Sequence, residues 1–282
     1  MQRKTLSLII FLATIIAITI PLAILTSGAG TDTFSANVTV QNNVPTITWV
    51  EAAGDSPQAG DTKIIQIDFN VSDNNTVTDI VTASSHMNIT RSGETARLSS
   101  ACFSVSNSSD NLEQSITCNI TIYWYDEAGA WNISVYATDG TGSDSDSTTA
   151  DFTMGTTDDI NVIETALTFT GNPGQANVAS SDNPLVINNT GNQPYTSINI
   201  TGYNLTGGGD TIGATDFAVN ISNSGGPGDA LAHNAPIVIT GSSLTRGASA
   251  TEDLYFWVDI PSGIVDTDYN TGGNPWTIDP IV

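Results

Sequence analysis

Basic side chains are almost missing from this sequence. Its 282 residues contain 6 Lys and Arg against 29 Asp and Glu, which gives a formal net charge of −23. The imbalance comes from a shortage of bases rather than an excess of acids, because only 12% of the residues are charged. Such a surface repels phosphates, so we expect no nucleic acid among the partners. Solubility must instead rest on Ser, Thr, Asn and Gly, which suit strands, turns and sugar attachment.

Recognisable catalytic motifs are missing as well. The two histidines, His86 and His233, lie in no nucleophile or metal motif, and no Gly-rich phosphate loop leads into a helical pattern. The adjacent acids at 126–127 and 158–159 fall in turns or linkers. We therefore predict a protein that is not an enzyme. A secreted hydrolase is kept as an alternative, because the two carboxylates of a glycosidase are paired in space rather than in sequence.

Charge is also absent from a long apolar run near the N-terminus. Arg3 and Lys4 precede the uncharged residues 5–26, and the small residues 27–29 follow. The pattern predicts a hydrophobic helix within 1–29. It is either a signal peptide cut after the small residues or an uncut anchor, since the run is long enough to span a bilayer. A prepilin-like signal is a third option. Each places the following chain outside the cell, because the basic pair stays in the cytoplasm.

Cysteine is scarce, and Cys102 and Cys118 are the only two. An even count in an exported chain predicts one disulfide, the alternative being two buried free thiols. Strand alternation puts Cys118 on an inner face with Ile120. It puts Cys102 on the face opposite Phe103 and Val105, the pair that we expect to point inward. The bridge therefore requires a β-bulge or a place at the edge of the core.

Helical periodicity is missing beyond residue 36, where alternation with a period of two takes over. In "TKIIQIDFNVSD", residues 62–73, one face is apolar and the other polar, which predicts a half-buried strand. Similar runs occupy 197–201, 217–221 and 254–260, with clusters of Gly, Asn, Asp, Pro and Ser between them. Many short strands with frequent turns predict an all-β chain built from β-sandwiches. The apolar face of the first run carries Ile65, Ile67, Phe69 and Val71.

A boundary near residue 155 is predicted to divide the exported part into domains 36–155 and 156–282. The first contains "VPTITWVEAAGDSPQAGDTKIIQIDFNVSDNN" and "WYDEAGAWNISVYATDG" and resembles the immunoglobulin-like modules of archaeal surface proteins. The second, with "LVINNTGNQPYTSINITGYNLTG" and "LYFWVDIPSG", is similar to the NEW3 and CARDB-like adhesion sandwiches. The resemblance implies two tandem immunoglobulin-like β-sandwich domains in a secreted, archaeal-type surface protein. It specifies fold and setting, and not an activity.

The stretch 118–140, "CNITIYWYDEAGAWNISVYATDG", predicts a hairpin that turns at "YDEAGA". Asn119 and Asn132 would then point outward at its opposite ends. The side chains predicted to point inward are Ile120, Ile122, Trp124, Trp131, Ile133 and Val135.

The triplet Asn-x-Ser/Thr is unusually frequent. Eleven copies occur, where a random order of the same residues would give about six. Asn is depleted in strands, yet it fills outward strand positions that Thr would suit better. We predict surface N-glycosylation; alternation of polar residues is the competing explanation for part of the excess. The acceptors would be Asn37, Asn70, Asn74, Asn88, Asn107, Asn119, Asn132, Asn188, Asn199, Asn204 and Asn220.

Two acidic stretches offer the hard oxygen ligands that calcium prefers. Neither has the spacing of an EF-hand, and Asp and Asn are also ordinary turn residues. We predict no cofactor and keep calcium as a weak candidate. Its ligands would come from Asp73, Asn75, Asp79, Asp139, Asp144 and Asp146.

These patterns predict an extracellular, structural glycoprotein of the cell surface, a subunit of an envelope layer or filament. The expected partners are further copies of the chain or other surface proteins, together with N-linked glycans; the membrane is met only through the N-terminal segment. The alternatives are a monomeric adhesin or carbohydrate-binding module anchored at its N-terminus, and the secreted hydrolase. For a filament, the stretch "TFSANVTVQNN", 33–43, could add a strand to a sheet edge of the next subunit.

Overall fold

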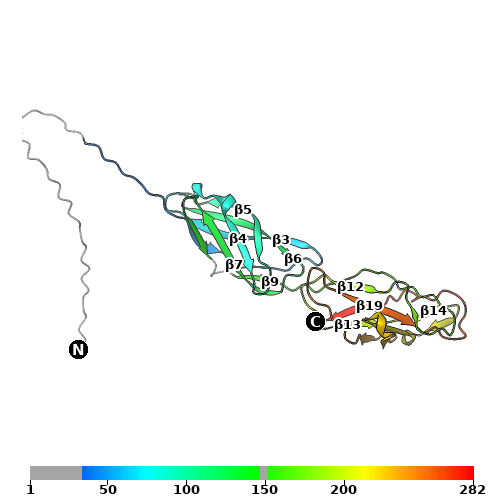
Figure 1. Cartoon of the computed structure of the whole chain (residues 1–282). Helices are drawn as coiled ribbons and strands as arrows, with labels where there is room; N and C mark the ends of the chain where they lie inside the picture. The colour runs from blue at the N-terminus through cyan, green and yellow to red at the C-terminus, as the bar shows by residue number, and fades with distance from the viewer. Residues whose placement is uncertain (1–33, 147–150) are drawn as a thin grey trace, which may run out of the picture. The chain divides into compact units, whose positions relative to one another are not determined.

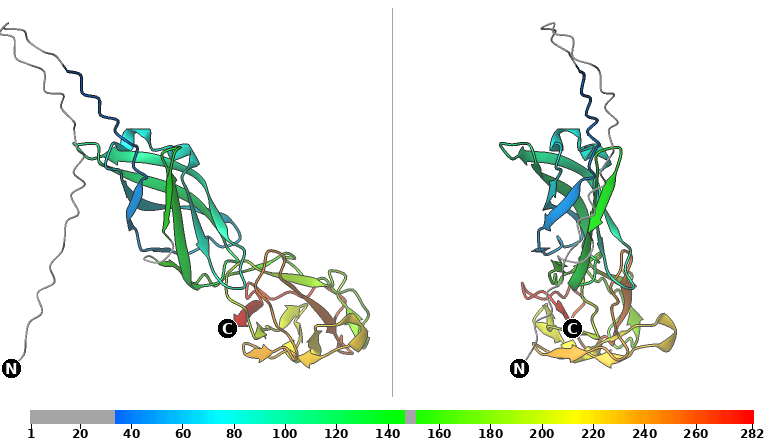
Figure 2. Two further views of the ribbon diagram at one scale, coloured as in Figure 1. Left: turned by 60° about the vertical axis from the view of Figure 1, so that its left-hand side comes forward. Right: turned by 90° about the vertical axis from the view of Figure 1, so that its left-hand side faces the viewer.

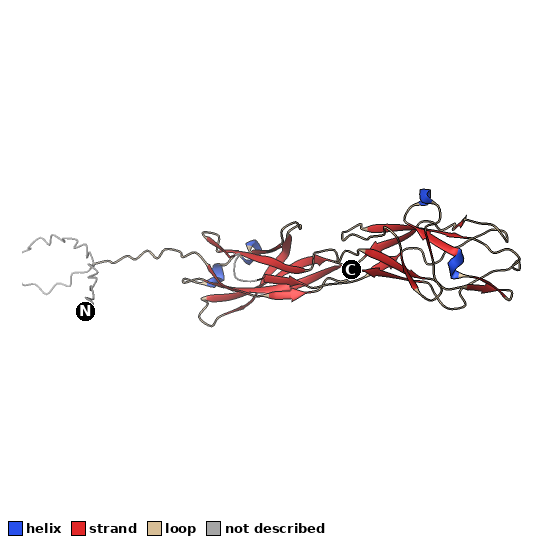
Figure 3. Ribbon diagram, turned by 90° about the horizontal axis from the view of Figure 1, so that it is seen from below, coloured by secondary structure: helices blue, strands red, loops and turns tan. Residues whose placement is uncertain are grey.

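The computed structural model describes residues 34–146 and 151–282 (Figure 1). The helix predicted within 1–29 lies outside them. The chain forms two compact units, 1–41 and 42–282. The described residues of the first unit contain no strand or helix. In the second, the regular structure is strand apart from short 3-10 turns (Figure 3). The prediction of an all-β chain is therefore confirmed, and no helix among the described residues is long and apolar enough to cross a membrane.

The first half of the larger unit is a β-sandwich. Its nine described strands form one sheet in the order β1-β3-β6-β5-β4-β7-β9-β2, with β8 beside β7. Only a short pairing joins β5 to β4, and there the sheet folds over into two layers, β1-β3-β6-β5 and β4-β7-β9-β2 (Figure 2). All ladders are antiparallel except β2 with β9. The strands are β1 (Thr46–Val50), β2 (Ala53–Asp55), β3 (Thr62–Ser72), β4 (His86–Thr90), β5 (Arg97–Asn107), β6 (Glu113–Tyr123), β7 (Gly129–Thr138), β8 (Ser143–Asp146) and β9 (Asp151–Met154). Two 3-10 turns, η1 (Val77–Asp79) and η2 (Thr82–Ser84), precede β4.

Alternation positions the core of this sandwich. On β3 the predicted residues are all buried, with Phe69 and Val71 fully so. They pack in one cluster with apolar side chains of β6, β4 and β7, among them Trp131. Each strand thus contributes every second side chain to the space between the layers.

The predicted hairpin over 118–140 is wrong. β6 pairs with β3 and β5, whereas β7 pairs with β4, β8 and β9, so the two strands lie in opposite layers. Ile120 and Ile122 are buried as predicted, and so are Trp131 and its alternate neighbours on β7. Trp124 follows the end of β6 and is only half-buried. Apart from Trp124, alternation identified the inward faces correctly. It could not identify the pairing, because two strands that face each other across a core show the same pattern as two strands of a hairpin.

The predicted disulfide between Cys102 and Cys118 is present. The two residues are direct partners on β5 and β6, and β5 is bulged on both sides of Cys102, at Ser99/Ala101 and Ser104/Ser106. Cys118 is fully buried, and Cys102 packs against the core while remaining partly exposed. The bridge therefore combines a bulge with a position at the edge of the core. The inward placing of Phe103 and Val105 was wrong. Phe103 pairs with the neighbour of Cys118 on β6, Thr117, and so points away from the side of the disulfide; Phe103 and Val105 are 42% and 59% exposed.

The second half of the larger unit also has two facing layers. Their orders are β10-β12-β19-β16-β17, with β11 beside β19, and β18-β13-β20; β14 and β15 form a separate ribbon. The strands are β10 (Ile160–Val162), β11 (Val178–Ala179), β12 (Leu185–Asn189), β13 (Ser197–Thr201), β14 (Leu205–Gly207), β15 (Asp210–Ile212), β16 (Phe217–Asn220), β17 (Asp229–Ala230), β18 (Pro236–Val238), β19 (Thr251–Val258) and β20 (Thr277–Ile281). The 3-10 turns are η3 (Ala214–Asp216) and η4 (Asn223–Gly225).

Polar contacts join the two sandwiches. The side chain of Asn192 is fully buried, and its Nδ2 donates to the main-chain oxygens of Asp126 (3.0 Å) and Gly155 (2.8 Å). Arg246 donates to Glu94, with Nη2 and Oε1 2.5 Å apart. The cores themselves are separate clusters, one ending at β9 and the next starting at β10. Division into domains 36–155 and 156–282 stays a prediction, because 42–282 holds together as one unit.

Candidate functional site

An apolar groove opens along one side of the second sandwich. It encloses about 840 Å³ between the edge strands β10 and β20, and its floor is the core itself, at Leu185, Ile200, Phe217 and Phe256. Half-buried apolar side chains form its two walls. They are Ile160, Val162, Leu167 and Phe169 on the β10 side, and Leu205, Tyr269, Trp276 and Ile278 on the β20 side.

Main-chain hydrogen bonds distinguish the two edges of this groove. The oxygen of Asp159 and the N–H of Ile163 both bond to residues at β12. In an antiparallel ladder, successive residues direct their main-chain N–H and C=O groups alternately toward and away from the neighbouring strand. Ile160 and Val162 therefore direct theirs away from β12. No described strand pairs with that side of β10. On β20 the oxygen of Ile281 accepts from the N–H of Thr196, beside β13. By the same alternation Pro280 faces the free edge of β20, and proline has no N–H.

Residues 34–41, "FSANVTVQ", form the described part of the smaller unit. Phe34, Val38 and Val40 are 93%, 86% and 82% exposed. They share one face of an extended chain with Ala36, while the other face is polar and contains Asn37. The pattern is that of a strand whose apolar face has no partner among the described residues.

The predicted sugar acceptors lie at the surface or partly covered, and none of them is fully buried. Four are exposed: Asn37, Asn74, Asn107 and Asn132. The other seven are half-buried, and their amides differ in availability. Nδ2 of Asn220 already donates to the oxygen of Gly226 at 3.0 Å, holding the loop after β16. The half-buried acceptors are Asn70, Asn88, Asn119, Asn188, Asn199, Asn204 and Asn220.

The two acidic stretches meet at one end of the first sandwich. Asn42 connects them, because its Oδ1 accepts from Asn75 (2.5 Å) and its Nδ2 donates to Asp139 (2.6 Å). The N–H of Gly142 lowers the pKa of Asp139 to about 2 despite the opposing effect of burial, and Thr141 and Asn42 add to this. Asp139 is thus an anion held by donors at any ordinary pH.

Calcium binding at this end stays an untested hypothesis. One oxygen each of Asp73 and Asp79 is buried without a hydrogen-bond partner. Asp144 accepts from the N–H of Ile47 (2.9 Å), and the side chain of Asp146 lies outside the described part. Within 34–146 and 151–282, no three acidic, cysteine or histidine side chains are grouped so as to hold a metal.

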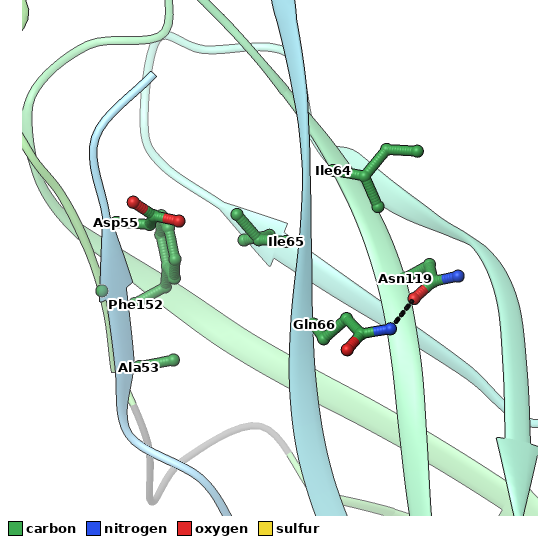
Figure 4. A pocket seen from close by; sticks show the side chains of 8 residues that line it. Ala53, Asp55, Ile64, Ile65, Gln66, Asn119 and Phe152 are labelled. Atoms are coloured by element: carbon green, nitrogen blue, oxygen red, sulfur yellow. Dashed lines mark hydrogen bonds between the residues drawn. The ribbon is translucent and has the colours of Figure 1, made fainter. Parts of the chain in front are cut away.

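A smaller polar hollow of about 370 Å³ lies between β2 and β3 (Figure 4). Gln66 and Asn119 are on one side of it, joined by a hydrogen bond of 3.0 Å, and Asp55 is on the other. Asp55 is the only carboxylate in the lining and is already paired with Lys63 at 2.6 Å. The hollow therefore holds no pair of acids for glycoside hydrolysis.

The histidines take part in surface packing. The ring of His86 stacks on Tyr136 with centroids 4.6 Å apart. Nδ1 of His233 accepts from the main-chain N–H of Asn204 at 3.1 Å. Both residues are exposed.

No protein-family model matches the chain, and a search of curated proteins also finds no match. The features that bear on function are therefore the groove, the exposed strand-like segment and the acceptor asparagines. Sequence reasoning identified the segment and the asparagines. It missed the groove, whose wall residues come from 160–169 and 205–278 and show no joint pattern along the chain.

Proposed function

We propose that the chain is a structural subunit of an extracellular surface layer or filament, decorated with N-linked sugars. The observation that carries the proposal is the apolar face of 34–41, because three large side chains exposed by more than four-fifths would be costly in an isolated subunit. Burial against another copy removes that cost. Strand addition would supply both apolar contacts and main-chain hydrogen bonds.

The strand order supports the setting that the resemblance implies. The orders β1-β3-β6-β5 and β4-β7-β9 are similar to the ABED and CFG layers of immunoglobulin sandwiches, although here β5 also pairs with β4. The disulfide departs from the antibody pattern, since it joins neighbours in one layer rather than the two layers. Immunoglobulin-like sandwiches serve in many cell-surface proteins, and an extracellular location agrees with the disulfide and with the acceptor triplets.

The test is assembly of the full chain, secreted from a glycosylating host. In the double variant Val38→Thr/Val40→Thr, two apolar side chains become polar with little change in shape, and the acceptor triplet at Asn37 is kept. We expect oligomers or filaments of the unchanged protein by light scattering and electron microscopy, and their loss in this variant. Gln41→Thr, on the polar face, is the matched control. A monodisperse monomer at high concentration would reject assembly and favour the monomeric adhesin.

Glycosylation has its own test. Intact-glycopeptide mapping of the secreted protein should find sugars first at the exposed acceptors, because a transferase must reach the amide. These are Asn37, Asn74, Asn107 and Asn132. Half-buried Asn220, whose Nδ2 is bonded, should be the least occupied. If all eleven sites were unmodified, the glycoprotein part of the proposal would fail while the assembly part stood.

A further inference from the structure

We propose that the apolar groove of the second sandwich is the acceptor for residues 34–41 of a second copy of this chain, which enters as an added strand beside β10. The inference rests on the proposed self-assembly and specifies its contact. It joins two features that are each incomplete alone: a groove with a core floor and half-buried walls, and a strand-like segment with a wholly exposed apolar face.

The edges of the groove determine where the strand would pair. The N–H and C=O groups of Ile160 and Val162 point away from β12, and no strand of the described residues pairs with them. β20 offers less, because Pro280 lies on its free edge and cannot donate. A strand added to β10 extends the layer β10-β12-β19-β16-β17 and places alternate side chains between the two layers.

The segment has the chemistry that this position needs. Phe34, Val38 and Val40 would enter the groove, and the polar alternate residues would face solvent. Asn37 belongs to the outward set, so a sugar on it would not obstruct insertion. The segment carries no charge in a chain of net charge −23, and the acid in the lining, Glu164, already accepts from the N–H of Val186 at 2.7 Å. No unpaired charge is buried by the contact.

A segment cannot enter the groove of its own chain. Asn42 is hydrogen-bonded to Asn75 and Asp139, beyond the far end of β3, whereas Gly60 at the near end of β3 bonds to Thr190, next to β10. β3 has 11 residues, which span about 33 Å. The eight residues 34–41 reach at most about 29 Å when fully extended, which is less than the length of β3, so they cannot lie alongside β10 of the same chain. The occupant must come from another copy.

The first experiment maps the contact. A photo-crosslinking amino acid replaces Val38 in the full chain, and subunits labelled with light and heavy nitrogen are mixed before irradiation. We expect crosslinks between light and heavy subunits that map by mass spectrometry to the groove walls, 160–169 and 269–278. Crosslinks within one subunit, or to another surface such as the free edge of β18, would overturn the proposal.

The second experiment blocks the edge. Val162→Pro removes an N–H that points away from β12 and leaves the native ladder intact, so we expect a folded subunit whose assembly is at least tenfold weaker. Ile160→Pro gives a second variant at the same edge, should the first fail to fold. Pro280→Ala, on the free edge of β20, is the control and should assemble normally.

The outcomes separate the two proposals. If assembly depends on Val38 and Val40 but is unchanged in a folded Val162→Pro or Ile160→Pro protein, self-assembly stands and the groove is not the acceptor. If the unchanged chain does not assemble at all, both proposals fail together.

Discussion

The ion pair between Arg97 and Asp126 holds the turn between the two layers of the first sandwich, and its removal gives a quantitative test. The Asp126 side chain is 0% exposed and that of Arg97 is 11% exposed. Nε of Arg97 donates to both carboxylate oxygens, at 3.0 and 3.1 Å, and the N–H of Tyr123 donates at 2.9 Å. The guanidinium carbon also lies 4.4 Å from the centre of the Tyr123 ring. Burial acts to lower the pKa of Arg97, but the hydrogen bonds and charge of Asp126 outweigh it, so the pKa is raised.

We expect Arg97→Met to lower the free energy of unfolding by about 3 to 5 kcal/mol, because it leaves a buried carboxylate with one main-chain donor. Urea unfolding followed by tryptophan fluorescence measures the change. Lys63→Met is the matched control: Lys63 and Asp55 are 38% and 39% exposed, so their pair should contribute less than about 1 kcal/mol. The double variant Arg97→Met/Asp126→Asn should recover part of the loss. If Arg97→Met cost no more than Lys63→Met, the buried pair would not stabilise the turn.

Two further predictions concern the same sandwich. The pKa of Asp139 is lowered from 3.8 to about 2, so the stability that its carboxylate contributes is present above pH 3.8 and is lost as the pH falls toward 2. The free energy of unfolding, measured against pH, should show this loss. Asp139→Asn should not show it, and its pH dependence should otherwise be unchanged. Replacing both Cys102 and Cys118 by Ala opens a loop with a sequence separation of 16 and should lower the free energy of unfolding by roughly 3 kcal/mol. A loss below about 0.5 kcal/mol in urea would contradict the second prediction.

Local patterns predicted the inward faces of strands but not their partners. β3 has its buried face as expected. In a strand with one buried and one solvated face, apolar and polar residues alternate, and this alternation alone determines which face is buried. Ile120 and Trp131 were placed inward correctly and paired wrongly, since alternation records which face is buried and not which strand lies beside it. Phe103 was misplaced because each bulge in β5 adds one residue and reverses the faces that follow.

The candidate site was less predictable than the fold. The segment 34–41 is visible in the sequence because its alternation is local. The groove depends on β10 and β20, which are separated by more than a hundred residues and do not pair with each other. Which edge of the groove would accept a strand depends on the direction of the main-chain groups of Ile160 and Pro280. That direction is determined only by the register of β10 with β12 and of β20 with β13. Likewise nothing in the sequence links the two acidic stretches, which Asn42 bridges in the fold.

Charge and sequence together explain why assembly would use such a small neutral element. Subunits of net charge −23 repel each other at long range, although physiological salt screens this beyond about 8 Å. A contact made by exposed carboxylates would keep the repulsion at short range, where screening is weakest. An uncharged strand that pairs through its main chain and buries Phe34, Val38 and Val40 would avoid this cost. Its hydrogen bonds and apolar contacts attract the partner without bringing carboxylates together. Acidic faces that also carried the proposed sugars would keep subunits from associating elsewhere, so a single neutral strand and its groove would determine how copies meet.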